Sequence, residues 1–118
     1  MAMPVIRPEL IDRVAHRFRV LSDPARLRLI TVLMDDTELC VTELMARVGQ
    51  PQASVSKHLQ IMAREGILNR RKDGLRVFYS LADPTLHGVC RLVVDQVMDD
   101  STGEAPGTGR EDTGNGPR

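Results

Sequence analysis

The chain has 118 residues, with 16 basic and 16 acidic side chains and a formal net charge of zero at pH 7. This length suits one domain and is too short for two ordinary ones. Apolar residues make up 42% of the chain and aromatic residues only 3%, so aliphatic side chains and methionine must form the core. Two cysteines do not make a disulfide framework. No segment approaches the roughly 18 apolar residues of a membrane span, and we expect a cytoplasmic protein with no membrane partner.

The neutral net charge hides an uneven distribution along the chain. Residues 47–76 contain seven basic side chains and two acidic ones, whereas residues 95–118 contain six acidic side chains and two basic ones. Position matters more than the sum, because the middle of the chain would attract a phosphate backbone while the acidic end would not. Residues 47–76 are therefore the candidate nucleic-acid-binding region.

Start signals for two helices occur in the first third of the chain. Pro8 can occupy the first turn of a helix that runs to about Val20, since apolar residues follow it at helical spacing. Ser22 or Asp23 can cap a second helix that begins at Pro24. The chain therefore opens with two consecutive helices.

A third and a fourth helix are predicted to meet at a tight corner. Thr42 is the predicted cap of the third helix, and Gly49 stops it. Pro51 forbids a continuous helix through this point, so the next helix begins near Gln52. Gly66 stands where the end of that helix favours a left-handed residue.

The pattern then changes to two β-prone runs on either side of Asp73–Gly74. An Asp-Gly pair supplies a tight hairpin turn, and here the tip and the first arm of the hairpin are cationic. Asp83–Pro84 starts a last helix whose broad apolar face needs a partner. The residues of that face are Leu86, Val89, Cys90, Val93, Val94 and Val97.

The end of the chain is rich in glycine and proline and has almost no apolar side chains. Such a composition does not support a packed core, so we expect this segment to be disordered. The expected organisation is one domain over residues 1–99 and a disordered tail over residues 100–118.

This order of elements predicts a mainly α fold of the α+β type, a winged helix-turn-helix with five helices and a two-stranded β-hairpin wing. In such a fold the recognition helix reads base edges in the major groove, while the cationic hairpin straddles the neighbouring backbone. We therefore predict a DNA-binding surface from the fourth helix and the hairpin. Its candidate residues are Gln52, Ser54, Ser56, Lys57, His58, Arg64, Arg70, Arg71, Lys72 and Arg76.

The candidate residues have different expected roles. Gln52 can address adenine with two hydrogen bonds, and Lys57 suits a phosphate. Early serines and a lysine are often merely solvated, and arginines on a strand can serve to discourage edge-to-edge pairing. Here these residues occur together with a tight corner between two helices and a cationic hairpin, and this combination favours binding to nucleic acid.

Four segments of the chain stand in the order typical of one known family. They are Leu21–Ile30, Glu38–Leu44, Gln52–Leu59 and Gly66–Leu68, the last continued by Phe78–Leu81. With these motifs the sequence resembles the ArsR/SmtB metalloregulators over residues 10–98. The resemblance implies a transcriptional repressor that binds an imperfect inverted repeat of double-stranded DNA as a homodimer joined through its first and last helices. The surplus apolar surface of these two helices agrees with a two-fold dimer.

The resemblance also makes Cys40 and Cys90 candidate sensor residues, because similar repressors release DNA when a metal ion or a thiol-reactive species binds. A Cys-Val-Cys triplet holds arsenite or soft metals in some of them, but here the triplet reads Cys40-Val41-Thr42. Trivalent arsenic or a soft metal wants about three thiolates, of which this chain supplies at most two. Arsenite or a soft metal at Cys40 and Cys90 is thus a hypothesis with an incomplete ligand set.

A second site type of the family, for zinc, nickel or cobalt, lies on the last helix. Asp83 and Asp99 supply its acids, but Thr85 and Gln96 occupy its imidazole positions and His87 is two residues out of place. Zinc prefers nitrogen and sulfur ligands, so we expect no metal here.

Other interpretations of the cysteines remain open. A redox or persulfide switch between Cys40 and Cys90 would need Cα atoms within about 7 Å. Alternatively, both side chains are small buried hydrophobes and the inducer acts elsewhere.

Two other classes of function fit this sequence less well than a repressor. A winged-helix module that binds only protein would carry a neutral recognition helix and an uncharged wing, which is the opposite of this sequence. An enzyme is not expected, because the chain has no Gly-rich phosphate loop, no nucleophile with a base and no paired buried carboxylates.

Overall fold

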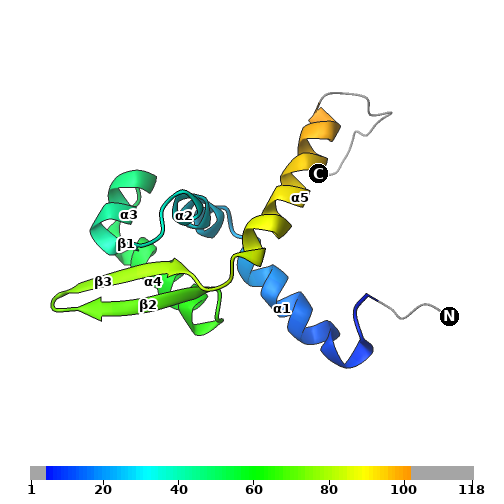
Figure 1. Ribbon diagram of the computed structural model, residues 1–118, viewed down its shortest axis with the longest axis horizontal. Coiled ribbons are helices and arrows are strands. Elements are labelled where there is room, and N and C mark those ends of the chain that lie inside the picture. The colour runs from blue at the N-terminus through cyan, green and yellow to red at the C-terminus, as the bar shows by residue number, and fades with distance from the viewer. Residues whose placement is uncertain (1–4, 102–118) are drawn as a thin grey trace. The chain divides into compact units, whose positions relative to one another are not determined.

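The computed structural model describes residues 5–101, and the chain divides into two compact units at Asp83 and Pro84 (Figure 1). The second unit contains one helix, α5 (Thr85–Ser101). The first unit contains a 3-10 turn, η1, followed by four helices and three strands. They are η1 (Pro8–Leu10), α1 (Ile11–Leu21), α2 (Pro24–Asp35), β1 (Leu39–Cys40), α3 (Val41–Val48), α4 (Gln52–Arg64), β2 (Leu68–Asp73) and β3 (Arg76–Leu81).

The junction between α1 and α2 is fixed by two adjacent side chains. Asp23 is the N-cap of α2, and its Oδ1 accepts the amide of Ala25 at 2.7 Å. The Ser22 hydroxyl instead donates to the carbonyl of Arg19, at 2.9 Å, and so satisfies the end of α1. Of the two caps that the sequence allowed, Asp23 is therefore the one that α2 uses.

Helix α3 begins two residues earlier than its predicted cap implied. Cys40, not Thr42, is the N-cap residue, and its amide donates to Glu43 Oε1 at 2.8 Å. The Cys40 side chain accepts the Glu43 amide in return, which completes a capping box. The prediction of Thr42 was wrong because a thiol here takes the place of the usual hydroxyl.

Three antiparallel strands form a sheet in the order β1-β3-β2. The predicted hairpin of β2 and β3 is confirmed, and in Figure 1 it projects past α3 and α4. Asp73 pairs with Arg76, so the turn consists of Gly74 and Leu75 rather than Asp73 and Gly74. Gly74 adopts a φ of 63°, as the first position of a two-residue hairpin turn requires. The short strand β1, which the sequence analysis did not predict, pairs with β3.

The core of the first unit lies between α2, α3, α4 and the sheet. Tyr79 is its one aromatic residue among the buried side chains described. Deleting a large aliphatic side chain here would cost about 2–5 kcal/mol. The fully buried residues are Leu29, Ile30, Leu44, Val55, Leu59 and Met62.

Helix α5 is largely exposed along its length. It continues through Asp99 and Asp100 to Ser101, so the first residues assigned to the disordered tail are helical. The remainder of that expected tail, residues 102–118, lies outside the described residues. None of the described helices has both the length and the apolar character to cross a membrane.

Candidate nucleic-acid interface

Helices α3 and α4 meet at a corner over residues 49–51. Gly49, with a φ of 67°, ends α3, and its amide donates to the carbonyl of Met45 at 2.9 Å. Pro51 begins α4, and its carbonyl accepts the amide of Val55 at 3.0 Å. No side chain caps α4, so its start presents amides whose dipole favours an anionic partner.

Helix α4 has a buried side and an exposed side. Val55, Leu59 and Met62 are fully buried and fix the helix on the core. The opposite side of its first two turns carries amide, hydroxyl and ammonium groups, which can bond to base edges and phosphates. These exposed or half-buried residues are Gln52, Ser54, Ser56 and Lys57.

His58 takes part in a contact within the protein. Arg26 donates from Nε to His58 Nδ1 at 3.2 Å and from Nη1 to the carbonyl of Val20 at 3.0 Å. A neutral imidazole that accepts at Nδ1 carries its proton on Nε2, so only Nε2–H is left to contact DNA. Arg26 thereby connects the end of α1 and the start of α2 to the candidate recognition helix.

Asp23 adds a negative charge at this junction. Desolvation acts to raise the pKa of Asp23, but hydrogen bonds from the amides of Ala25 and Arg26 outweigh it, with help from the positive charge of Arg26. The pKa of Asp23 therefore lies below its ordinary value, and the carboxylate stays ionised at neutral pH.

Arg64 is exposed in the last turn of α4. It lies about 18 Å along the helix axis from Gln52, because each residue adds about 1.5 Å. The structure therefore does not group Arg64 with the other candidates of α4.

The two faces of the hairpin carry different sets of cations. Arg70 pairs with Tyr79 and Lys72 with Val77, so these four side chains project to one face of the sheet. Arg71 pairs with Phe78 on the opposite face. The predicted cationic wing thus presents Arg70 and Lys72 on one side and Arg71 and Arg76 on the other.

Arg71 is engaged with a carboxylate. Its Nε and Nη2 donate to the two carboxylate oxygens of Glu38 at 2.9 and 2.8 Å, and its guanidinium lies 4.6 Å from the centre of the Phe78 ring. This hydrogen bonding lowers the pKa of Glu38 and raises that of Arg71. Arg71 joins the hairpin to the segment before β1, and a phosphate contact from it stays a prediction.

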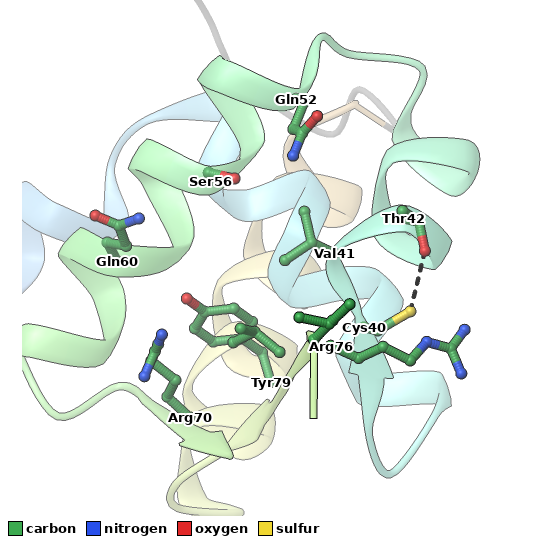
Figure 2. A pocket seen from close by; sticks show the side chains of 11 residues that line it. Cys40, Val41, Thr42, Gln52, Ser56, Gln60, Arg70, Arg76 and Tyr79 are labelled. Carbon is green, nitrogen blue, oxygen red and sulfur yellow. Dashed lines mark hydrogen bonds between the residues drawn. The ribbon is translucent and has the colours of Figure 1, made fainter. Parts of the chain in front are cut away.

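A hollow of about 280 Å³ lies between α4, the start of α3 and the hairpin (Figure 2). Four of the predicted DNA-binding residues line it: Gln52 and Ser56 from α4, and Arg70 and Arg76 from the hairpin. No carboxylate is among its described lining residues. The predicted DNA-binding residues outside this lining are Ser54, Lys57, His58, Arg64, Arg71 and Lys72.

Gln60 and Tyr79, which the sequence analysis did not select, also line the hollow. Gln60 could have been found, because it follows Gln52 and Ser56 at intervals of four residues on one helix face. Tyr79 carried no such signal, since its position in an alternating strand predicts only a core-facing ring.

The two cysteines lie in different units. Cys40 is 2% exposed, with its Sγ 3.2 Å from Thr42 Oγ1, and its amide lowers the pKa of Glu43. Cys90 is half-buried in α5, and burial raises the pKa of its thiol, which disfavours the reactive thiolate. Within residues 5–101 no group of three or more His, Cys, Asp and Glu residues is placed to hold a metal ion.

Comparison with known sequences matches residues 23–70 to the family described as bacterial regulatory protein, arsR family. These residues run from the cap of α2 through α3 and α4 into β2. The chain is 33% identical over 99 residues to a transcriptional repressor SmtB homolog of Synechocystis sp., which covers 80% of this chain and 74% of that protein.

Two solved structures have the same fold. The AntR antimony-specific transcriptional repressor aligns with a TM-score of 0.76 and 29% identity, over 86% of this chain and 92% of that one. A homodimeric winged helix-turn-helix DNA-binding domain from Mycobacterium bovis aligns with a TM-score of 0.68 and 25% identity, over 94% of this chain and 100% of that one. The hairpin of β2 and β3 corresponds to the wing of this fold.

Proposed function

The chain belongs to the ArsR family of bacterial regulatory proteins, and we propose that it occupies an imperfect inverted repeat of DNA as a homodimer until an inducer releases it. As a member of this family it is a DNA-binding transcriptional repressor and not an enzyme. The proposal concerns its operator, the residues that contact DNA and the inducer.

The observation that carries the proposal is the surface shared by α4 and the hairpin. Gln52 and Ser56 of α4 line one hollow together with Arg70 and Arg76 of the hairpin, and no carboxylate is among its described lining residues. This arrangement suits a helix in the major groove beside a backbone held by the wing. A module that binds only protein has no need for it.

The roles within this surface follow from the chemistry of the side chains. Gln52, at the start of α4, is the candidate for base recognition, because an amide can donate to and accept from adenine. Lys57, Arg70, Lys72 and Arg76 supply charges to phosphates and set affinity rather than sequence preference.

The homodimer uses apolar side chains that each unit leaves exposed. On α1, Ile11 and Phe18 are 50% and 56% exposed, and on α5, Leu92 and Val93 are 69% and 52% exposed. Exposed side chains of this size mark an interface, and a two-fold dimer would present two copies of α4 to two half-sites.

A titration of DNA from upstream of the protein's own gene tests the operator. The full-length reduced protein should bind this DNA with a midpoint at least a thousandfold lower than for a scrambled duplex of equal length. Equal affinity for both duplexes would contradict the proposal and favour a protein-binding module.

For the inducer, we propose a thiol-reactive species or trivalent arsenic acting first at Cys40. Cys40 both caps α3 and lines the hollow, so an adduct on its Sγ would break the capping box beside the DNA-binding surface. Because Cys40 is almost fully buried, such a reaction needs a local opening of the start of α3. The similar AntR repressor is antimony-specific, which supports a metalloid as one class of inducer.

Cys40→Ser provides a clean test of the inducer, because serine is also a good N-cap and should preserve α3. Arsenite or an organic polysulfide should release wild-type protein from DNA and leave the Cys40→Ser complex intact. Cys90→Ser is the comparison variant. If the inducer no longer releases this variant from DNA, Cys90 also takes part in sensing, and if release is normal, it does not. Release that is unchanged in both variants, or absent in the wild type, would point to a non-thiol effector.

A further inference from the structure

Tyr79 combines a buried ring with an open hydroxyl. The residue is only 2% exposed, and its ring lies in the core of the first unit. None of the hydrogen bonds of residues 5–101 involves its hydroxyl. The hydroxyl is nevertheless not among the buried polar atoms without a partner in the described part of the chain, so it is open to the hollow that Tyr79 lines. A hydroxyl in this position can bond to a ligand that enters the hollow.

The Tyr79 hydroxyl faces the hollow between α4 and the hairpin. Tyr79 is one of the residues that line this hollow, and in Figure 2 its oxygen points toward the side where Gln60 and Arg70 lie. Arg70 is also the cross-strand neighbour of Tyr79. Gln60 of α4, Arg70 of β2 and Tyr79 of β3 thus line the same hollow.

These three side chains form a group of donors. Arg70 takes part in no ion pair within the described part of the chain, unlike Arg71, which is paired with Glu38. A guanidinium only donates hydrogen bonds, a phenol can donate one, and the amide of glutamine can donate two. With no carboxylate in the described lining, the complementary ligand is an oxyanion.

We propose that this hollow receives a single phosphate, a phosphodiester of the DNA backbone, whose oxygens accept hydrogen bonds from Tyr79 Oη, Arg70 and Gln60. The proposal rests on the proposed function, since it assumes that α4 enters the major groove. The backbone strand beside that groove would then run between α4 and the wing. Tyr79 becomes a DNA-contacting residue, and the hollow fixes the register of the protein along the duplex.

Tyr79→Phe tests the proposal by removing one oxygen atom. Operator affinity should fall about tenfold, because a hydrogen bond to a charged group is lost. The slope of log affinity against log salt should stay unchanged, since no charge is removed, whereas Arg70→Gln should lower that slope by about 0.9. Ser80→Ala is the matched control, because it deletes a hydroxyl from the opposite face of β3 and should leave affinity unchanged. An unchanged affinity of Tyr79→Phe would overturn the proposal.

Replacing backbone phosphates one at a time by neutral methylphosphonates identifies the phosphate. At one position in each half-site the wild type should lose affinity, and Tyr79→Phe should lose clearly less. Thermal unfolding should first show that the wild type and Tyr79→Phe are equally well folded. If the losses from Tyr79→Phe and from the methylphosphonate are then additive at every position, the hollow does not bind a backbone phosphate. Wild-type protein that binds no operator at all would instead contradict the proposed function itself.

The same oxyanion chemistry would also suit free inorganic phosphate. Thermal unfolding in phosphate and in chloride, at equal ionic strength, separates the two sources. A stabilisation by phosphate that Tyr79→Phe abolishes, combined with no coupling in the methylphosphonate scan, would make the hollow a small-anion site and overturn the DNA assignment.

Discussion

The hydrogen bond from Arg26 to His58 joins the first turn of α2 to the middle of α4. Since Arg26 also donates to the carbonyl of Val20, one side chain holds three helices at the point where the recognition surface begins. We therefore propose that His58 acts on DNA binding mainly by fixing the orientation of α4. This role needs an acceptor at the position of Nδ1, not an imidazole as such.

Two substitutions of His58 separate this positioning role from direct contact. An asparagine amide oxygen lies near the position of Nδ1, and a glutamine amide lies near Nε2. We expect His58→Asn to keep nearly wild-type operator affinity, and His58→Gln and Arg26→Gln to lose about two- to tenfold, the value of one hydrogen bond. Fluorescence anisotropy measures the affinities. Equal losses in the asparagine and glutamine variants would mean that the ring itself touches DNA.

Asp23 allows a prediction about pH and stability. Its pKa is lower in the folded protein than in the unfolded chain, so its contribution is present above the ordinary aspartate pKa of about 3.9 and is lost as the pH falls through the folded value. Asp23→Ala should lower the free energy of unfolding by about 1 kcal/mol at pH 7, and the difference should shrink below pH 4. Urea unfolding across this range measures it. Asparagine at position 23 caps the helix without a titrating group, so the contribution of this cap to the free energy of unfolding of Asp23→Asn should not change with pH.

At the scale of the elements, the wing is held by contacts that its own sequence does not reveal. Arg71 binds Glu38 through two hydrogen bonds and lies over Phe78, so its charge is already compensated. Arg70, one residue earlier, projects to the hollow. We propose that these neighbouring arginines of one strand have separate functions, with Arg71 holding the wing in place and Arg70 contacting DNA.

The salt dependence of operator binding should reveal this division. Each phosphate contact contributes about 0.9 to the slope of log affinity against log salt, so Arg70→Gln should reduce the slope by about that amount. Arg71→Gln should reduce it by less than half as much, because Glu38 already neutralises this side chain. Glu38→Gln frees Arg71 and serves as the control, with an unchanged or steeper slope. Equal reductions for both arginines would refute the separate roles.

The elements that local rules determine could be predicted from the sequence. Gly49 and Gly66 both adopt positive φ angles where helix ends were expected, and Asp23–Pro24 starts α2. Strand β1 could not be predicted, because its two residues pair with Phe78 and Tyr79, almost 40 positions later. The cap of α3 was misplaced because cysteine is an unusual N-cap.

In the candidate site, too, local features could be predicted from the sequence and contacts between distant segments could not. Helical periodicity identified the exposed start of α4, and the charge pattern identified the hairpin. The contacts between distant segments escaped detection, namely Arg26 with His58, Arg71 with Glu38, and Tyr79 with the hollow. Each depends on which face of one element meets another, and that is a property of the tertiary structure.

At the scale of the whole molecule, the exposed apolar side chains of α1 and α5 require a partner surface. Leu92 and Val93 are adjacent on α5, and both are more than half exposed. Apolar exposure of this extent on a helix is expected of a subunit interface. Two-fold symmetry would then set the spacing of the two α4 helices to the spacing of two half-sites.

Leu92→Glu tests this interface. A buried negative charge at a two-fold contact should convert the dimer to a monomer, as seen by sedimentation equilibrium, and should weaken binding to the full inverted repeat at least tenfold. Arg91→Ala, one residue earlier and 70% exposed at its side chain, is the control and should remain dimeric. A Leu92→Glu protein that stays dimeric would place the interface elsewhere.

The central claim, that α4 reads base sequence while the wing holds the backbone, is tested most directly with Gln52→Ala. The measurement is the ratio of affinities for the operator and for a scrambled duplex, determined for both proteins at the same salt concentration. We predict that Gln52→Ala lowers this ratio by a factor corresponding to about 1–3 kcal/mol and leaves the affinity for scrambled DNA unchanged. A ratio near one for the wild type, or equal losses on both duplexes for Gln52→Ala, would contradict the account.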